Sequence, residues 1–496
     1  MINYKPDAVL RAVFSGVLFA AALLPACAVN PVTGQSNFVM MSEEDEIRLG
    51  RDAHADIIKE YGGIYDNPAL QSYVQRIGGS LAGVSHRSNL VYRFTVLDSP
   101  MVNAFALPGG YIYITRGLLA YLNSEAELAA VLGHEIGHVT ARHSVRQISA
   151  ARAAEIGYKI GAILVPELQT QTAQSLFNIL GSAMISGYGR DHELEADRLG
   201  AEYLARDGYD PQAMIRVIGV LKNQEDFEKQ LAKEEGREPR VYHGVFASHP
   251  DNDTRLQQVV ASAEALKTES ANHDDREGFL DRVDGLVYGG SEREGIMRSN
   301  AFYHSALGIA FDFPPGWKVD NHPDRLTAAP PSNDGLLQLI VEDVNKPITP
   351  LEFMTQRLKL SKLKQDEELN PAGLEGHTAV AQVNTSFGRR DTRFSVIYHN
   401  NRAYVFIGVA KDPKLPAKYD QEFLATTNSF HPLEAQEMPL AKALSIHLYP
   451  VQKDDNVEKI AGRSIIANHA QEQLRLLNGI YPDGEPVVGQ RFKIVQ

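Results

Sequence analysis

The spacing of apolar and polar residues changes several times along the chain. Residues 12–24 form an unbroken apolar run, residues 43–265 mostly follow the period of amphipathic helices, and much of residues 297–434 alternates as strands do. We therefore predict an α+β protein. It consists of a mostly helical domain with a small sheet over residues 42–290, an α+β domain over residues 297–434, and a smaller C-terminal domain.

Local signals place several elements of these domains. Ser42 precedes four acidic residues, which is typical of a helix start. Residues 92–97 and 102–115 alternate as strands, and the second segment folds about the turn Pro108-Gly109-Gly110. In the second domain, the segments Arg393–Tyr398 and Ala403–Val409 predict a hairpin.

The N-terminus has the parts of an export signal. Basic residues precede the apolar run of residues 12–24, which is too short to span a bilayer, and the small residue Ala26 precedes Cys27. Residues 1–26 resemble a bacterial lipoprotein signal, which implies that Cys27 is lipidated and that Ala28 directs sorting to the outer membrane. The alternative is a plain secretory signal with an incidental cysteine. Residues 27–41 are rich in turn residues and predict a tether.

The candidate chemistry lies in VLGHEIGHVTARHS, which spans residues 131–144. Residues four apart on a helix share a face, so His134 and His138 project together with Glu135 beside them. A zinc peptidase requires this arrangement of two imidazole ligands and a carboxylate that accepts a proton from water. Ser124 and Glu127 predict the start of this helix as a capping box.

The site needs a third ligand. His143 follows His138 at about 140° around an ideal helix, so we expect it either on the surface or beside the ligands without binding the metal itself. The later segment DHELEAD offers Glu193 as the third ligand and Asp197, on the same face, as an acceptor for the second ring proton of a ligating histidine. Glu195 is expected to point elsewhere, and His192 is a rival ligand only if the helix is rotated.

GHEIGHVTARHS, ELEAD and SHPDNDTR together resemble the zinc metallopeptidase family that includes CAAX prenyl proteases, HtpX, mitochondrial Oma-type proteases and BepA. The resemblance covers about residues 30–270. It implies a gluzincin-like core that binds one Zn²⁺, with Glu135 as general base and Asp197 beside the ligands. It also implies that His249, with Arg255 nearby, stabilises the oxyanion or that His249 caps the metal. The chain lacks the membrane-spanning helices of HtpX and the prenyl proteases and the helical repeats of BepA.

Residues 441–496 read as strand, helix, helix and strand. Three segments, which begin at Val451, Leu474 and Val488, resemble the LysM fold, although Asp454 replaces the usual glycine. We therefore expect a LysM-like βααβ domain with either a peptidoglycan-binding or a structural role.

Composition restricts the partners. The net charge of −13 argues against a nucleic-acid partner, and the single cysteine excludes an internal disulfide framework. A polypeptide substrate would pair with a strand edge at Asn103, Ala104 and Phe105, unless this strand lies inside the sheet.

The sequence thus predicts a zinc endopeptidase on the periplasmic side of the bacterial envelope, anchored to the membrane through Cys27 and acting in protein quality control. The alternative is a latent or chaperone-like zinc-binding scaffold attached to the outer membrane and peptidoglycan. A zinc hydrolase that does not act on peptides is a third reading.

Overall fold

The chain folds into two compact units. The computed structural model describes residues 27–164, 189–236, 272–322, 325–412 and 416–496, and a few isolated positions between 237 and 271. The first unit contains Met1–Ile58, Ile64–Leu286 and Ile446–Gln496, and the second contains Lys59–Gly63 and Val287–Ser445. Among the described residues, no helix is both long enough and apolar enough to cross a bilayer. The predicted mixture of helices and strands is confirmed.

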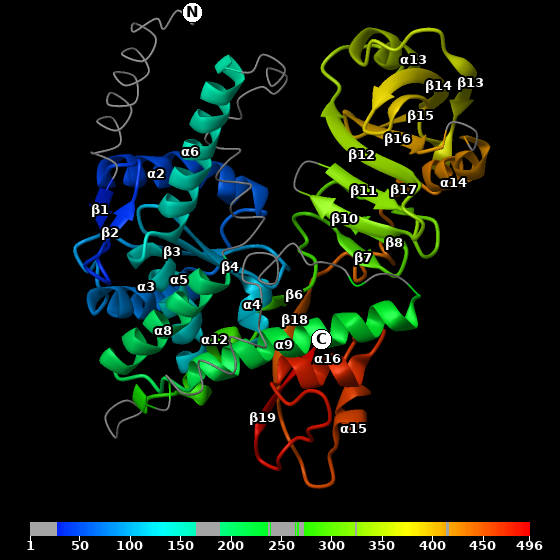
Figure 1. Ribbon diagram of the computed structural model, residues 1–496. Coiled ribbons are helices and arrows are strands. Elements are labelled where there is room, and N and C mark those ends of the chain that lie inside the picture. The colour runs from blue at the N-terminus through cyan, green and yellow to red at the C-terminus, as the bar shows by residue number, and fades with distance from the viewer. Residues whose placement is uncertain are drawn as a thin grey trace, which may run out of the picture. The chain divides into compact units, whose positions relative to one another are not determined.

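Helices make up most of the first unit (Figure 1). They are α2 (Glu43–Glu60), α3 (Pro68–Gly83), α4 (Arg116–Tyr121), α5 (Glu125–Thr140), α6 (His143–Leu164), α8 (Arg190–Arg206), α9 (Ala213–Glu234) and α12 (Arg276–Val283). Helix α2 starts where the sequence predicts, because the Ser42 hydroxyl accepts a hydrogen bond from the backbone N–H of Asp45 at 3.1 Å. Ahead of α2, the predicted tether contains a short antiparallel hairpin of β1 (Cys27–Val29) and β2 (Ser36–Phe38).

A three-stranded sheet lies within the helices of this unit. Its strands are β3 (Arg93–Leu97), β4 (Ala104–Leu107) and β5 (Tyr111–Thr115), in the order β3-β5-β4. Strand β5 pairs in parallel with β3 and antiparallel with β4, so β4 forms an edge among the described strands. Gly109 and Gly110 turn between β4 and β5 with φ of 79° and 86°, a conformation that favours glycine.

Helices α5 and α8 pack closely because small residues face each other where they meet. A Cβ atom on Gly137 would lie 2.9 Å from the backbone oxygen of Ala196, and one on Gly133 would lie 3.3 Å from that of Gly200. Larger side chains at these positions would hold the helices apart. The close approach brings the histidines of α5 within reach of the carboxylates of α8.

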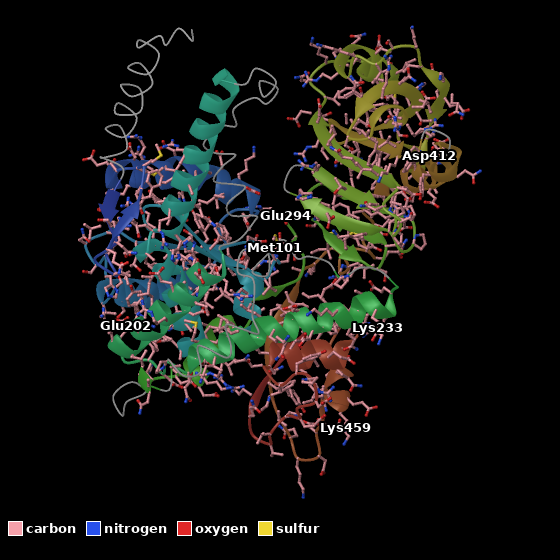
Figure 2. The ribbon with its side chains drawn as sticks, viewed as in Figure 1. Met101, Glu202, Lys233, Glu294, Asp412 and Lys459 are labelled. Carbon is pink, nitrogen blue, oxygen red and sulfur yellow. The ribbon has the colours of Figure 1, made fainter. Side chains whose placement is uncertain are left out.

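The C-terminal residues join the first unit. They form β18 (Leu444–Pro450), α15 (Val457–Ala461), α16 (Ala470–Leu477) and β19 (Arg491–Val495), and β18 pairs antiparallel with β19. The fully buried Lys493 donates hydrogen bonds to the backbone oxygens of Ala120 and Leu122, at 2.7 and 2.8 Å. These hydrogen bonds anchor the last strand directly ahead of α5. Lys459 in α15 and Lys233 near the end of α9 are labelled in Figure 2.

The second unit is mostly antiparallel sheet. Its strands are β6 (Val287–Tyr288), β7 (Ile296–Arg298), β8 (Ala301–His304), β9 (Ile309–Asp312), β10 (Lys318–His322), β11 (Arg325–Ala329), β12 (Gly335–Asp343), β13 (Lys364–Leu369), β14 (Gly376–Thr385), β15 (Gly388–His399), β16 (Arg402–Ala410) and β17 (His431–Pro432), with helices α13 (Pro350–Glu352) and α14 (Pro416–Asn428). Seven strands form one sheet in the order β10-β11-β12-β16-β15-β14-β13. The predicted hairpin is confirmed as β15 and β16, which turn through Asn400 and Asn401 with φ of 49° and 58°.

Candidate metal centre

Helix α5 supplies the first half of the candidate site. Its N-cap is Ser124, whose side chain accepts a hydrogen bond from the backbone N–H of Glu127 at 3.3 Å, as the sequence predicts. The Glu127 carboxylate instead accepts from the backbone N–H of Asn123 at 2.7 Å. Every residue of α5 is buried, including His134, Glu135 and His138. Burial of three polar side chains in one apolar helix has a cost unless they have partners, which indicates a functional site.

Helix α8 supplies the second half. Oε2 of Glu193 lies 3.6 Å from Nε2 of His134, and Oε1 lies 3.5 Å from Nε2 of His138. The two Nε2 atoms are 2.9 Å apart. The three residues form a buried group that could hold a metal ion. The structure thus brings together the three side chains that the sequence predicts as ligands.

The Nδ1 atoms of His134 and His138 each lie beside a polar side chain, and these contacts bear on the tautomer of each ring. Oδ1 of Asp197 lies 2.8 Å from Nδ1 of His134, and Nδ1 of His143 lies 2.8 Å from Nδ1 of His138. A proton on each of these Nδ1 atoms, accepted by Asp197 and by His143, would leave each Nε2 with a lone pair. The two lone pairs then face each other across 2.9 Å.

This arrangement fits a tetrahedral metal ion. Two facing lone pairs repel, and a cation between them would remove the repulsion. Zinc bonds of 2.0–2.1 Å in tetrahedral geometry separate neighbouring ligand atoms by about 3.3 Å. The observed separations of 2.9, 3.5 and 3.6 Å lie on either side of that value. The ligand atoms of His134, His138 and Glu193 are therefore spaced as a tetrahedral metal ion would require.

His143 lies inside the protein beside His138, the second of the two expected positions, whereas the alternative position on the surface is wrong. Its ring is fully buried, and its Nε2 lies 3.1 Å from Oε2 of Glu195. His192 stacks on the same ring, with centroids 4.3 Å apart, and it is not a member of the group that could hold a metal ion. Burial lowers the pKa of His192 to about 4 and also lowers the pKa of His143. Both rings are therefore neutral at physiological pH.

The other predicted site residues occupy different parts of the chain. Ala104 and Phe105 lie in the edge strand β4, and Asn103 directly precedes it. Met101, labelled in Figure 2, lies in the segment that leads into β4, and its carbonyl accepts from the Thr115 hydroxyl at 2.5 Å. His249 and Arg255 fall outside the described residues, so their positions remain predictions. Cys27 begins strand β1.

Sequence reasoning missed the pairing of His143 with Glu195. No glycine or proline marks the end of α5 at Thr140, so a continuous helix was the natural expectation. The close packing of α5 and α8 did have a signal, because Gly133 and Gly137 are spaced one helical turn apart.

Comparison with known proteins also indicates a metallopeptidase. The family model described as peptidase family M48 matches residues 68–263. The β-barrel assembly-enhancing protease of Yersinia pestis is 29% identical over 251 residues, which cover 49% of this chain and 49% of that protein. The mitochondrial metalloendopeptidase OMA1 of Schizosaccharomyces pombe is 32% identical over 234 residues, which cover 46% of this chain and 64% of that protein.

The chain thus spans about half the length of the curated relatives it matches. The matched segment contains both α5 and α8, and with them all three members of the candidate metal site. Residues 68–263 of this chain therefore match peptidase family M48.

Proposed function

We propose that the chain is a zinc-dependent endopeptidase of the bacterial cell envelope that hydrolyses exported or misfolded envelope proteins. One observation carries the proposal: Nε2 of His134, Nε2 of His138 and the Glu193 carboxylate converge in a buried group, with Glu135 next to His134 on the same helix. Support also comes from relatives whose names describe a metalloendopeptidase and an assembly-enhancing protease.

The roles follow from the chemistry of each side chain. Zinc at such a site supplies Lewis acidity, which activates water for attack and polarises the scissile carbonyl. Glu135 takes the proton that the attacking water loses and delivers it to the nitrogen of the leaving amine. Asp197 holds the ring of His134 through Nδ1, 2.8 Å away. His249 and Arg255 remain the candidates for stabilising the oxyanion.

The substrate would bind as an extended segment along β4. A peptide that adds to a strand edge pairs through its own backbone, so the pairing is largely independent of the peptide's sequence. Phe105 in β4 stacks on Tyr113 of β5, with ring centroids 4.9 Å apart, and this contact stiffens the edge. An extended substrate would thereby present its backbone carbonyl in a fixed orientation, as endopeptidase chemistry requires.

The envelope location rests on the N-terminal segment and on the relatives. We propose that residues 1–26 direct export and that lipidation of Cys27 anchors the chain to the outer membrane. The role of the LysM-like C-terminal region in binding peptidoglycan also remains a proposal.

The test is cleavage of an unfolded outer-membrane β-barrel protein by the zinc-loaded full chain. We expect cleavage by the wild type and none by Glu135→Gln, because the amide cannot accept the proton. Glu202→Gln is the control for loss of a helical carboxylate, since Glu202 lies on α8 and pairs with Arg198 and Arg206 rather than with the candidate ligands. Glu202 is labelled in Figure 2. Equal cleavage by wild type and Glu135→Gln would rule out the proposed chemistry. Cleavage by His249→Ala alone would support the alternative of a latent protein.

A further inference from the structure

A break between helices α5 and α6 places His143 against the candidate metal site. Helix α5 ends at Thr140, Arg142 adopts a left-handed φ of 57°, and α6 begins at His143. The buried Glu46 fixes this turn, because its Oε2 accepts from Nε of Arg142 at 3.0 Å. His143 therefore does not continue the spiral of α5. Its side chain folds back onto the outer edge of the His138 ring.

The contacts of His143 form a continuous chain of hydrogen bonds. At one end, its Nδ1 lies 2.8 Å from Nδ1 of His138. At the other end, its Nε2 lies 3.1 Å from Oε2 of Glu195, an oxygen that also accepts from Arg146 at 3.3 Å. The His192 ring stacks on His143 at an interplanar angle of 17°, which holds the imidazole in its plane.

Only one assignment of donors and acceptors along these hydrogen bonds is compatible with metal binding. A carboxylate only accepts hydrogen bonds, so Nε2 of His143 donates to Glu195. Nδ1 of His143 is then the acceptor for the proton on Nδ1 of His138. That tautomer leaves Nε2 of His138 with the lone pair that a metal ion needs.

We propose that His143 and Glu195 are a positioning pair that fixes the tautomer and the ring orientation of the ligand His138. The proposal rests on the function proposed above. His138 would thereby receive the same kind of support that Asp197 gives to His134, but through an intervening imidazole.

The proposal assigns a distinct task to each acid of the segment ELEAD. Glu193 faces the two Nε2 atoms, Asp197 lies beside Nδ1 of His134, and Glu195 acts through His143 on His138. Helix α8 is thus predicted to orient both imidazole ligands as well as to supply the third ligand. Loss of this support from a ligating histidine typically lowers metal affinity about 10- to 100-fold.

The test compares variants of the full chain by two readouts besides activity. Zinc affinity is measured by competition with a chromophoric chelator, and Co²⁺ is substituted to record the visible spectrum, which reports coordination geometry. His143→Phe removes both ring nitrogens but keeps a ring of similar size. Glu195→Ala removes the acceptor for Nε2 of His143, and Glu195→Gln retains an oxygen that can accept this hydrogen bond.

We expect His143→Phe to lose about 10- to 100-fold in zinc affinity and to alter the Co²⁺ spectrum. Glu195→Ala should show a smaller loss, and Glu195→Gln should restore nearly wild-type values. His377→Phe is the matched control, because it removes a buried histidine that pairs with Asp366 in the second unit. If Glu195 only stabilised the fold, Glu195→Gln would not restore the zinc affinity that Glu195→Ala loses.

Wild-type zinc affinity and an unchanged Co²⁺ spectrum in both His143→Phe and Glu195→Ala would overturn the proposal. If His143→Phe does not fold, the two Glu195 variants decide, because this side chain is one-fifth exposed and tolerates replacement. Failure of the wild type to bind zinc would instead overturn the proposed function on which the pair depends.

Discussion

Substitution of Gly137 by alanine should separate metal binding from folding. A Cβ atom at this position would lie 2.9 Å from the backbone oxygen of Ala196 and 3.1 Å from its Cα. Carbon atoms prefer separations of about 3.5–4.0 Å, so α5 and α8 would have to move apart by roughly half an ångström. The contacting atoms belong to the backbone of α8, so no side-chain rotation can relieve the clash.

The displacement acts directly on the site, because Gly137 and Ala196 are neighbours in sequence of His138 and Asp197. Metal sites tolerate deviations of only about 0.2 Å in ligand distances. We therefore expect zinc affinity to fall at least about tenfold, which corresponds to about 1.4 kcal/mol. The free energy of unfolding should fall by no more than about 2 kcal/mol, because overpacking costs about 1–3 kcal/mol and alanine gains about 1 kcal/mol over glycine within a helix.

The assay pairs zinc competition with urea unfolding of the metal-free chain. Gly79→Ala on α3 is the control, because its Cβ would meet nothing closer than 3.9 Å. That control should gain up to about 1 kcal/mol in stability from helix propensity and keep wild-type zinc affinity. Wild-type affinity in Gly137→Ala, or a gain in stability like that of the control, would refute the role of close helix packing.

Two further predictions concern buried charges. Burial lowers the pKa of Lys493 to about 7, whereas the unfolded chain keeps this proton up to its ordinary pKa of 10.5. The unfolded state therefore binds more protons between these values, so wild-type stability relative to Lys493→Met should rise by up to about 1.4 kcal/mol per unit from pH 7 to pH 10. The same pH dependence of the free energy of unfolding in the wild type and in Lys493→Met, measured by urea titration, would contradict this prediction. Arg87 pairs with the buried Glu46 at 2.8 Å, and Glu46 keeps Arg142 as a second partner, so Arg87→Met should lower the free energy of unfolding by about 1.5–3 kcal/mol, the contribution of a hydrogen bond to a charged group. The exposed Arg48 is the control, and its replacement should leave the urea midpoint unchanged.

The sequence predicts the ligand set because its geometry is local. On one regular helix, a spacing of four residues places His134 beside His138, and the same spacing places Glu193 near Asp197. The hairpins are local as well, since glycine and asparagine mark the positions of positive φ at Gly109, Gly110 and Asn400.

Contacts that depend on a break or on distant residues could not be predicted. The sequence does not predict which ring nitrogen His143 contacts, because the chain leaves helical geometry at Arg142 without a glycine or proline to mark the break. The anchoring of Lys493 joins residues more than 370 positions apart. A lysine in an alternating strand gives no local sign that its amine will be fully buried.

The most direct test of the account is the zinc content of the purified full chain and of Glu193→Ala, measured by elemental analysis after dialysis. We predict one zinc ion per chain in the wild type and in the control Glu202→Ala, and far less in Glu193→Ala, because two imidazoles alone hold zinc weakly. Stoichiometric zinc in Glu193→Ala would contradict the assignment of His134, His138 and Glu193 as the metal site.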